Sequence, residues 1–314
     1  MKTKLLFWGT GAIAVPTLER LLTMEDIQVV GVVTQADAPS GRHQEMTAPP
    51  IKTIAVQHCI PVFQPTTLKD DVLFAALTAH APDIAIVFAY GKIIPQRFLD
   101  IAKNGTLNVH PSLLPRHRGP TPVHAAILHG DAETGVTLIK LDAEMDHGPI
   151  VAQTALSLSG DETTETLSTT LAASSATFVE EILPKYLTGA ITPKEQNHDV
   201  ATYCKILDRD SGRVDWSLPA ETILRMARAY TPWPGIWTTW TDGTQTLRVK
   251  LFLPTITTET LPSGTLKQQN EKLLIGTGSS ALAVTEIHVE GKKRLPVSDI
   301  LRGNQKFLQG RFVS

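Results

Sequence analysis

The amino-acid sequence predicts an α/β fold, with a mostly parallel sheet in the first domain and a small β-barrel in the second. In the first half of the chain, short apolar runs alternate with helical patterns, which is typical of a parallel sheet covered by helices on both faces. In the second half, short strand-like runs follow one another at near-regular spacing, as they do in small barrels. The length of 314 residues is sufficient for two domains.

The first half predicts a Rossmann-like succession of strands and helices. Buried strands are expected at residues 5–8, 27–34, 84–88 and 107–109, and helices at 14–22, 72–80 and 95–102. Residues 136–141 and 150–156 lie close together with no helix-length segment between them, so we expect two antiparallel strands that extend the sheet. A long helical pattern over residues 165–186 closes this domain.

A change in the composition and pattern of the sequence predicts the domain boundary. Residues 190–208 are polar and follow Gly189, which indicates a linker between a first domain at 1–189 and a second at 209–314. A helix is expected at 220–230. The strands expected after it, at 236–240, 246–253, 272–275 and 281–289, predict an OB-like barrel.

The N-terminus allows two interpretations. Lys2 and Lys4 before an apolar stretch resemble a secretory signal, but Gly9 and Gly11 interrupt that stretch. We therefore interpret residues 5–8 as a strand that ends in a glycine turn. No apolar run approaches the ~20 residues that cross a bilayer, so no membrane partner is expected.

The glycine turn also has two interpretations. Gly9-Thr10-Gly11-Ala12-Ile13-Ala14 fits the Gly-x-Gly-x-x-Gly/Ala fingerprint of dinucleotide sites. The fingerprint further requires an acid about 20 residues later, at the end of the second strand. Here that strand ends in Thr34-Gln35, and Asp37 comes late. A purely structural turn is favoured, and a nicotinamide-dependent oxidoreductase is kept as an alternative.

Charge and cysteine content limit the partners and the compartment. The formal net charge of −2 divides into −7 for residues 1–204 and +5 for residues 205–314, which suggests that the C-terminal part meets an anionic partner. The two cysteines, Cys59 and Cys204, form neither a disulfide framework nor a zinc motif. We expect a reducing, cytoplasmic compartment and no metal.

Two polar residues at the end of a predicted strand indicate chemistry. Asn108 and His110 lie two positions apart, so they point to the same side, where ligands of open α/β sheets bind. An amide beside an imidazole provides two donors for an oxyanion that develops on a carbonyl carbon. A carboxylate from the following loop would hold the imidazole protonated and move protons. Asp142, Glu144 and Asp146 all qualify, and spacing alone does not choose among them.

These residues belong to a longer pattern that resembles the folate-dependent formyltransferases. The core of the pattern is Asn108-Val109-His110-Pro111-Ser112-Leu113-Leu114-Pro115. Further stretches match the family in the right order along nearly the whole chain. They are Thr34-Gln35-x-Asp37 together with residues 40–42, then residues 89–91, Arg118-Gly119 together with Pro122, residues 130–137, Asp146-x-Gly148 and residues 228–235. As a set they are far more specific than any single motif.

The resemblance implies a set of site residues. Asn108, His110 and Asp146 match the catalytic trio of the family. The stretch Ser112, Leu113, Leu114 and Pro115 matches the border of bound 10-formyltetrahydrofolate. Segments that match those binding the pterin ring through backbone groups contain Ala89, Tyr90, Gly91, Leu141 and Asp142. The implied reaction is acyl transfer without a protein nucleophile.

The resemblance also implies an RNA substrate, the initiator methionyl-tRNA. Arg42 matches a basic residue that reaches toward the acceptor end, although His43-Gln44-Glu45 stand where similar enzymes often carry lysines. In the positive second domain, Lys292, Lys293 and Arg294 are expected to follow tRNA phosphates. Alternatives are an N-formyltransferase for a nucleotide-linked amino sugar, which residues 34–52 disfavour, and a non-catalytic RNA-binding protein, which leaves the trio without a role. A monomer is expected.

Overall fold

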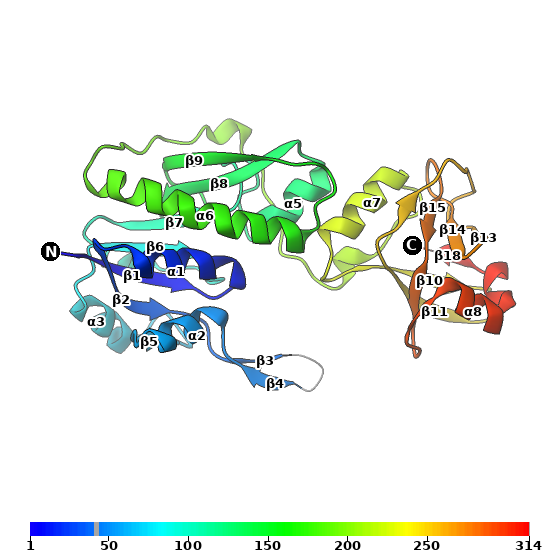
Figure 1. Ribbon diagram of the computed structural model, residues 1–314, viewed down its shortest axis with the longest axis horizontal. Coiled ribbons are helices and arrows are strands. Elements are labelled where there is room, and N and C mark those ends of the chain that lie inside the picture. Colours follow the sequence, from blue (N-terminus) through cyan, green and yellow to red (C-terminus); the bar gives the residue numbers. More distant parts are fainter. Residues whose placement is uncertain (41–43, 314) are drawn as a thin grey trace. The chain divides into compact units, whose positions relative to one another are not determined.

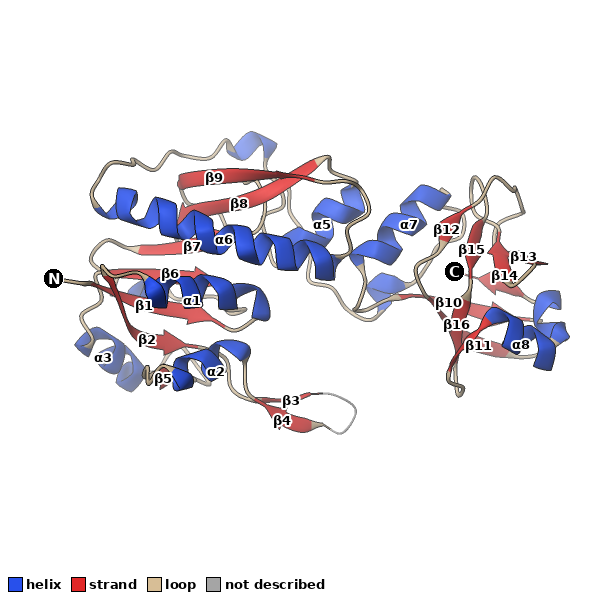
Figure 2. Cartoon of the chain, viewed as in Figure 1, coloured by secondary structure: helices blue, strands red, loops and turns tan. Residues whose placement is uncertain are grey.

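The computed structural model describes residues 1–40 and 44–313, which form two compact units (Figures 1 and 2). The first unit contains the described residues of Met1–Pro122, Glu133–Ser157 and Leu167–Lys205. The second contains those of Val123–Ala132, Leu158–Thr166 and Ile206–Ser314. Domain boundaries at 189 and 208 stay a prediction. Among the described residues, no helix combines the length and apolar character that a membrane span requires.

The first unit is built on a seven-stranded sheet in the order β5-β2-β1-β6-β7-β8-β9. The strands from β5 to β7 are parallel, while β8 and β9 are antiparallel additions, which confirms the prediction for these two strands. The strands are β1 (Thr3–Gly9), β2 (Ile27–Val33), β5 (Val62–Phe63), β6 (Ile84–Phe88), β7 (Thr106–His110), β8 (Glu133–Lys140) and β9 (Ile150–Ser157).

Helices cover both faces of this sheet (Figure 1). On one face, Trp8 and Val87 of the central strands pack with side chains of α3 and α4. On the other face lie α1 and α6, which an Arg20–Glu180 ion pair joins. The helices are α1 (Val15–Thr23), α2 (Pro50–Gln57), α3 (Asp71–Ala79), α4 (Gln96–Leu99) and α6 (Thr164–Leu187), which enters the first unit at Leu167. Central strands buried on both faces need continuous apolar runs, which explains why β1 and β6 were predictable.

Several elements of the first unit differ from the prediction. The helix expected at 95–102 is only the four residues of α4. Elements without a predicted counterpart are α2, β5 and the hairpin of β3 (Ala38–Ser40) and β4 (Glu45–Thr47). Strands of two or three residues are too short to produce a period in the sequence.

The second unit is an antiparallel β domain, as predicted (Figure 2). Five strands pair in the order β17-β16-β11-β10-β18 and four in the order β12-β15-β14-β13, with a bridge between Thr265 and Arg311. The strands are β10 (Ile236–Thr241), β11 (Thr246–Leu251), β12 (Thr255–Ile256), β13 (Leu266–Gln269), β14 (Lys272–Ile275), β15 (Leu282–Val284), β16 (Glu286–Val289), β17 (Arg294–Pro296) and β18 (Arg311–Val313). Its helices are α5 (Pro122–His129), α7 (Ala220–Ala229) and α8 (Val297–Gly303). The part of α5 that belongs to this unit begins at Val123.

One strand of the second unit was predicted wrongly. The run at 281–289 was expected to be one strand, but it is divided into β15 in one sheet and β16 in the other. The chain changes sheets at Thr285, and a strand that turns such a corner keeps its apolar pattern on both sides. The sequence period alone therefore does not reveal the break.

The glycine turn after β1 is bonded within the chain. The backbone N–H groups of Thr10 and Gly11 both donate to the carbonyl of Ala89, at 3.2 and 3.3 Å. A Cβ at Gly9 would lie 2.7 Å from the Phe7 ring and 3.0 Å from the Phe88 carbonyl. Close packing of β1 against β6 therefore explains the glycine at this position, and no bound nucleotide is needed to explain it.

The predicted linker at 190–208 contains a segment that is bonded to the first unit. Ile150 and Lys194 exchange two backbone hydrogen bonds of 2.7 and 2.8 Å. Further on, the Arg118 N–H donates to the Thr202 carbonyl and the Cys204 N–H donates to the Arg118 carbonyl, both at 2.8 Å. We call residues 194–204 the strap. It crosses the loop that follows β7, next to the candidate site.

Candidate active site

Asn108, His110 and Asp146 converge on one face of the sheet. Asn108 and His110 lie on β7 and point to the same side because they are two positions apart on a strand. Asp146 comes from the loop between β8 and β9, which folds back over this face. The Asn108 amide Nδ2 donates to Asp146 Oδ1 at 3.1 Å, and His110 Nδ1 lies 3.5 Å from Asp146 Oδ2. The three side chains thus form one group, joined by a hydrogen bond from Asn108 and an ion-pair contact with His110.

The Asp146 carboxylate accepts two hydrogen bonds and lies 3.5 Å from His110 Nδ1. Besides the Asn108 amide, the Gly119 backbone N–H donates to Asp146 Oδ2 at 2.8 Å. Gly119 has a φ of +113°, and a Cβ there would lie 2.6 Å from the Cys204 carbonyl oxygen. Glycine is therefore required at this position for both its conformation and the close approach of the strap.

Backbone geometry brings the Asp146 loop onto the face. Asp146 itself has a left-handed φ of +50°, which is uncommon for a non-glycine residue. Gly148 passes so close to β8 that a Cβ would lie 1.9 Å from the Lys140 carbonyl oxygen. Of the other acids in this loop, Asp142 pairs with His147 at 2.8 Å and Glu144 is exposed. The structure thus brings Asp146 to His110.

His110 is buried, with 4% of its side chain exposed, and both ring nitrogens face acceptors. Nε2 lies 3.0 Å from the His117 carbonyl oxygen, and Nδ1 faces the Asp146 carboxylate. Only a ring that carries hydrogens on both nitrogens can donate to both acceptors. Donation to a substrate oxygen therefore requires that one of these contacts be exchanged for it. The Asn108 amide has a second hydrogen beyond the one directed at Asp146.

The candidate folate residues Ser112, Leu113, Leu114 and Pro115 form the turn after β7, and hydrogen bonds to β8 hold this turn. The Ser112 side chain is fully buried and donates to the Arg116 carbonyl at 2.7 Å. Thr137 Oγ1 donates to the Ser112 carbonyl at 2.6 Å and accepts from the Leu114 N–H at 3.1 Å. A Cβ at Gly135 would lie 2.7 Å from the Leu113 side chain.

The other candidate folate residues lie at the ends of β6 and β8. Tyr90 points into the core, where its ring meets Trp8 edge to face at 5.2 Å, and burial raises the pKa of its phenol to about 12. Its carbonyl accepts from Gln35 Nε2 at 2.8 Å, and Ala89 and Gly91 both have positive φ. The Leu141 N–H donates to Thr106, whereas Asp142 pairs with His147. Any ligand contact of Tyr90 would therefore use its backbone.

The structure describes three of the four candidate tRNA contacts. Arg42 lies outside the described residues. Lys292 and Lys293 are exposed at the turn between β16 and β17. Arg294 donates to Glu286 at 2.8 Å through Nε, and its guanidinium lies 3.9 Å from the centre of the Phe252 ring. The two lysines are thus presented to solvent, whereas Arg294 already has an acidic partner.

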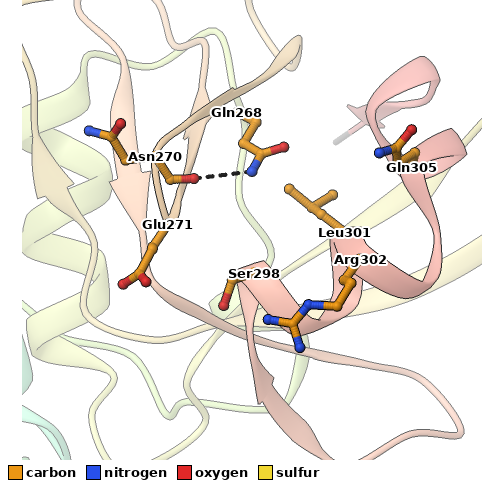
Figure 3. A pocket seen from close by; sticks show the side chains of 7 residues that line it. All are labelled: Gln268, Asn270, Glu271, Ser298, Leu301, Arg302 and Gln305. Atoms are coloured by element: carbon orange, nitrogen blue, oxygen red, sulfur yellow. Dashed lines mark hydrogen bonds between the residues drawn. The ribbon is translucent and has the colours of Figure 1, made fainter.

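Cysteine and metal chemistry receive little support from the described residues. Burial raises the pKa of the Cys204 thiol, which keeps it protonated, and Cys59 is exposed far from the trio in the sequence. In the part of the chain that the structure describes, no three His, Cys, Asp or Glu side chains are grouped as metal ligands. A hollow of about 310 Å³ in the second unit contains none of the predicted site residues (Figure 3). It is lined by Gln268, Asn270, Glu271, Ser298, Leu301, Arg302 and Gln305.

The residues that support the trio were not predicted from the sequence. Gln196 and Cys204 of the strap lie within hydrogen-bonding distance of the segments that carry Asp146 and Gly119. Arg118 was noted only as part of a motif, yet it is 1% exposed and donates to Gln196. A buried arginine needs hydrogen-bond acceptors. The position of Arg118 shortly after His110 was the one sequence signal that an acceptor such as Gln196 lies near the trio.

Comparison with known proteins shows the class of this chain, a formyl transferase. The family model described as Formyl transferase matches residues 1–183, and that described as Formyl transferase, C-terminal domain, matches residues 206–305. The chain therefore belongs to the formyl transferase family. Two relatives carry the name methionyl-tRNA formyltransferase. The one from Roseiflexus castenholzii is 44% identical over 306 residues and that from Akkermansia muciniphila 39% over 305, each match covering 96% of both chains.

Solved structures of lower identity share the fold. HypX from Aquifex aeolicus, in complex with tetrahydrofolic acid, is 22% identical with a TM-score of 0.63, covering 98% of this chain and 47% of that one. An N-formyltransferase from Helicobacter canadensis, in complex with folinic acid and dTDP-3-aminofucose, is 17% identical with a TM-score of 0.65. That match covers 90% of this chain and 99% of the other.

Proposed function

We propose that this chain transfers the formyl group of 10-formyltetrahydrofolate to the free α-amine of initiator methionyl-tRNA. The observation that carries the proposal is the convergence of Asn108, His110 and Asp146 within 3.5 Å contacts. It occurs in a chain that matches relatives of that name along 96% of its length. The family model and the folate-bound structural neighbours support the donor, and the names of the relatives support the acceptor.

The trio acts on the charge that develops during acyl transfer. 10-Formyltetrahydrofolate supplies, as co-substrate, a formyl carbonyl that an amine can attack without a protein nucleophile. The Asn108 amide and the His110 ring donate to the oxygen of that carbonyl as it becomes negative. Asp146 orients His110 and relays a proton from the attacking amine to N10 of the folate, which departs as its bond to the formyl carbon breaks. To donate, His110 exchanges one of its contacts, with the His117 carbonyl or with Asp146, for the substrate oxygen.

The two substrates are assigned to different segments. The turn at 112–115 and the ends of β6 and β8 border the folate, because they lie next to β7 in the sheet. Arg42, Lys292 and Lys293 bind tRNA phosphates, which fits the positive charge of residues 205–314. An amino-sugar substrate is the second candidate, since a structural neighbour was solved with dTDP-3-aminofucose. The relatives at 39–44% identity favour tRNA.

A transfer assay with two acceptors tests the proposal. Purified protein and 10-formyltetrahydrofolate are incubated with methionyl-tRNA in one reaction and with a dTDP-linked amino sugar in the other. We expect formylation of the tRNA only. Formylation of the sugar alone would assign the chain to the second candidate, and the absence of both products would reject the proposal.

Arg42→Ala is expected to raise the KM for methionyl-tRNA by about tenfold and to leave the KM for the folate unchanged, because a guanidinium binds phosphate strongly. Steady-state kinetics with each substrate varied in turn measures both constants. Arg20→Ala, a change of the same charge at an exposed position of α1, serves as the control. Equal effects of Arg42→Ala on both constants would mean that Arg42 does not contact RNA.

A further inference from the structure

A buried glutamine of the strap holds the loop that carries Asp146. Gln196 is 5% exposed, and its Nε2 donates to the carbonyl oxygens of both Asp146 and Gly148 at 2.8 Å. Both amide hydrogens are thus used on the backbone of one three-residue segment. They fix the segment at the point where Asp146 adopts its left-handed φ of +50°.

The orientation of this amide is set from its other side by Arg118. Gln196 Oε1 accepts from Arg118 Nε at 3.1 Å and from Nη2 at 2.7 Å. A guanidinium only donates, so the amide oxygen must face Arg118 and the NH₂ group must face the Asp146 loop. Arg118 is held in turn, since Nη2 lies 2.8 Å from His198 Nδ1 and Nη1 donates to the Tyr203 hydroxyl at 3.2 Å.

These contacts close a ring around the carboxylate. The side chain of Arg118 binds Gln196, and Gln196 binds the backbone of Asp146. The carboxylate of Asp146 accepts from the N–H of Gly119, which is the residue after Arg118. A displacement of Gln196 therefore releases the backbone of Asp146, whose carboxylate faces His110.

We propose that Gln196 is a positioning residue for formyl transfer: it fixes the Asp146 backbone so that the carboxylate faces His110 and Asn108. The inference rests on the proposed function of the trio. Gln196 acts through Asp146 and does not itself touch a substrate. Its loss therefore lowers kcat and leaves substrate binding intact, because the donors that meet the substrate remain in place.

Gln196→Glu keeps the oxygen of the amide and replaces its NH₂ group. The carboxylate retains the acceptor for Arg118, but it places an oxygen against the carbonyl oxygens of Asp146 and Gly148. We expect kcat to fall by about 10- to 100-fold, as for other displaced catalytic groups, with both KM values within about twofold. Thermal unfolding monitors the fold. Glu195→Gln, at the exposed neighbouring position of the strap, is the control and keeps wild-type kcat.

A double-mutant cycle distinguishes positioning from general stabilisation. In the Asp146→Asn background the group that Gln196 positions is already lost, so Gln196→Glu is expected to change kcat by less than about twofold. An equal fall of kcat in both backgrounds, or an unchanged kcat in the single variant, would overturn the inference. If Gln196→Glu does not fold, the same double-mutant cycle is measured with Gln196→Met, a side chain of similar size and shape. An inactive wild type would reject the proposed function itself, whereas an active wild type with a normal Gln196→Glu rejects only this inference.

Discussion

His110→Ala is expected to lower kcat for formyl transfer by at least ~10²-fold, because it removes a donor from the developing oxyanion. Binding of tRNA is expected to persist, since His110 is buried and is not one of the candidate tRNA contacts. Single-turnover transfer at saturating substrates measures the chemical step, and a filter-binding assay measures the affinity for tRNA.

Two controls make the result for His110 interpretable. His58→Ala changes an exposed histidine after α2 and is expected to keep full activity. His110→Gln retains a donor in the buried site and serves if the alanine variant is unstable. A His110→Ala protein that keeps more than a tenth of the wild-type rate would remove His110 from the chemistry.

Asp146→Asn is expected to lower kcat by about 10²- to 10³-fold and to lower the melting temperature. Hydrogen bonds from Asn108 and the Gly119 N–H converge on this carboxylate, and His110 Nδ1 lies 3.5 Å from it. An asparagine offers one acceptor oxygen, so at least one of the donors then faces an NH₂ group. The variant also removes the negative charge that lies 3.5 Å from His110 Nδ1.

Glu144→Gln is the matched control for Asp146→Asn, since it makes the same kind of change at an exposed acid of the same loop. We expect it to keep wild-type kcat and melting temperature. Comparable losses in both variants would indicate that the loop needs negative charge in general. In that case, the specific contacts of Asp146 would carry no role in the reaction.

The elements that were predictable from the sequence are those with a complete local signal. Residues 84–88 were expected as a strand and coincide with β6, because a strand buried on both faces is a continuous apolar run. The single helix expected at 220–230 corresponds to α7, whose apolar positions recur at the helical period. The switch between sheets at Thr285 has no such signal, since its cause is the closure of the second unit.

The candidate site was predictable only in part. The spacing of Asn108 and His110 on one strand indicated their shared direction. The choice of Asp146 over Asp142 and Glu144 came from the family resemblance, since the path of the loop depends on contacts distant in the sequence. Gln196 lies 50 residues beyond Asp146 and 78 beyond Arg118, so no local pattern links them.

A crystal structure of this protein with 5-formyltetrahydrofolate bound tests most directly whether formyl transfer takes place at the trio. The formyl oxygen is expected within hydrogen-bonding distance of Asn108 Nδ2, with the pterin ring against the ends of β6 and β8. Binding of the folate in the second unit, or with its formyl group directed away from β7, would contradict the assignment of Asn108, His110 and Asp146 to the reaction.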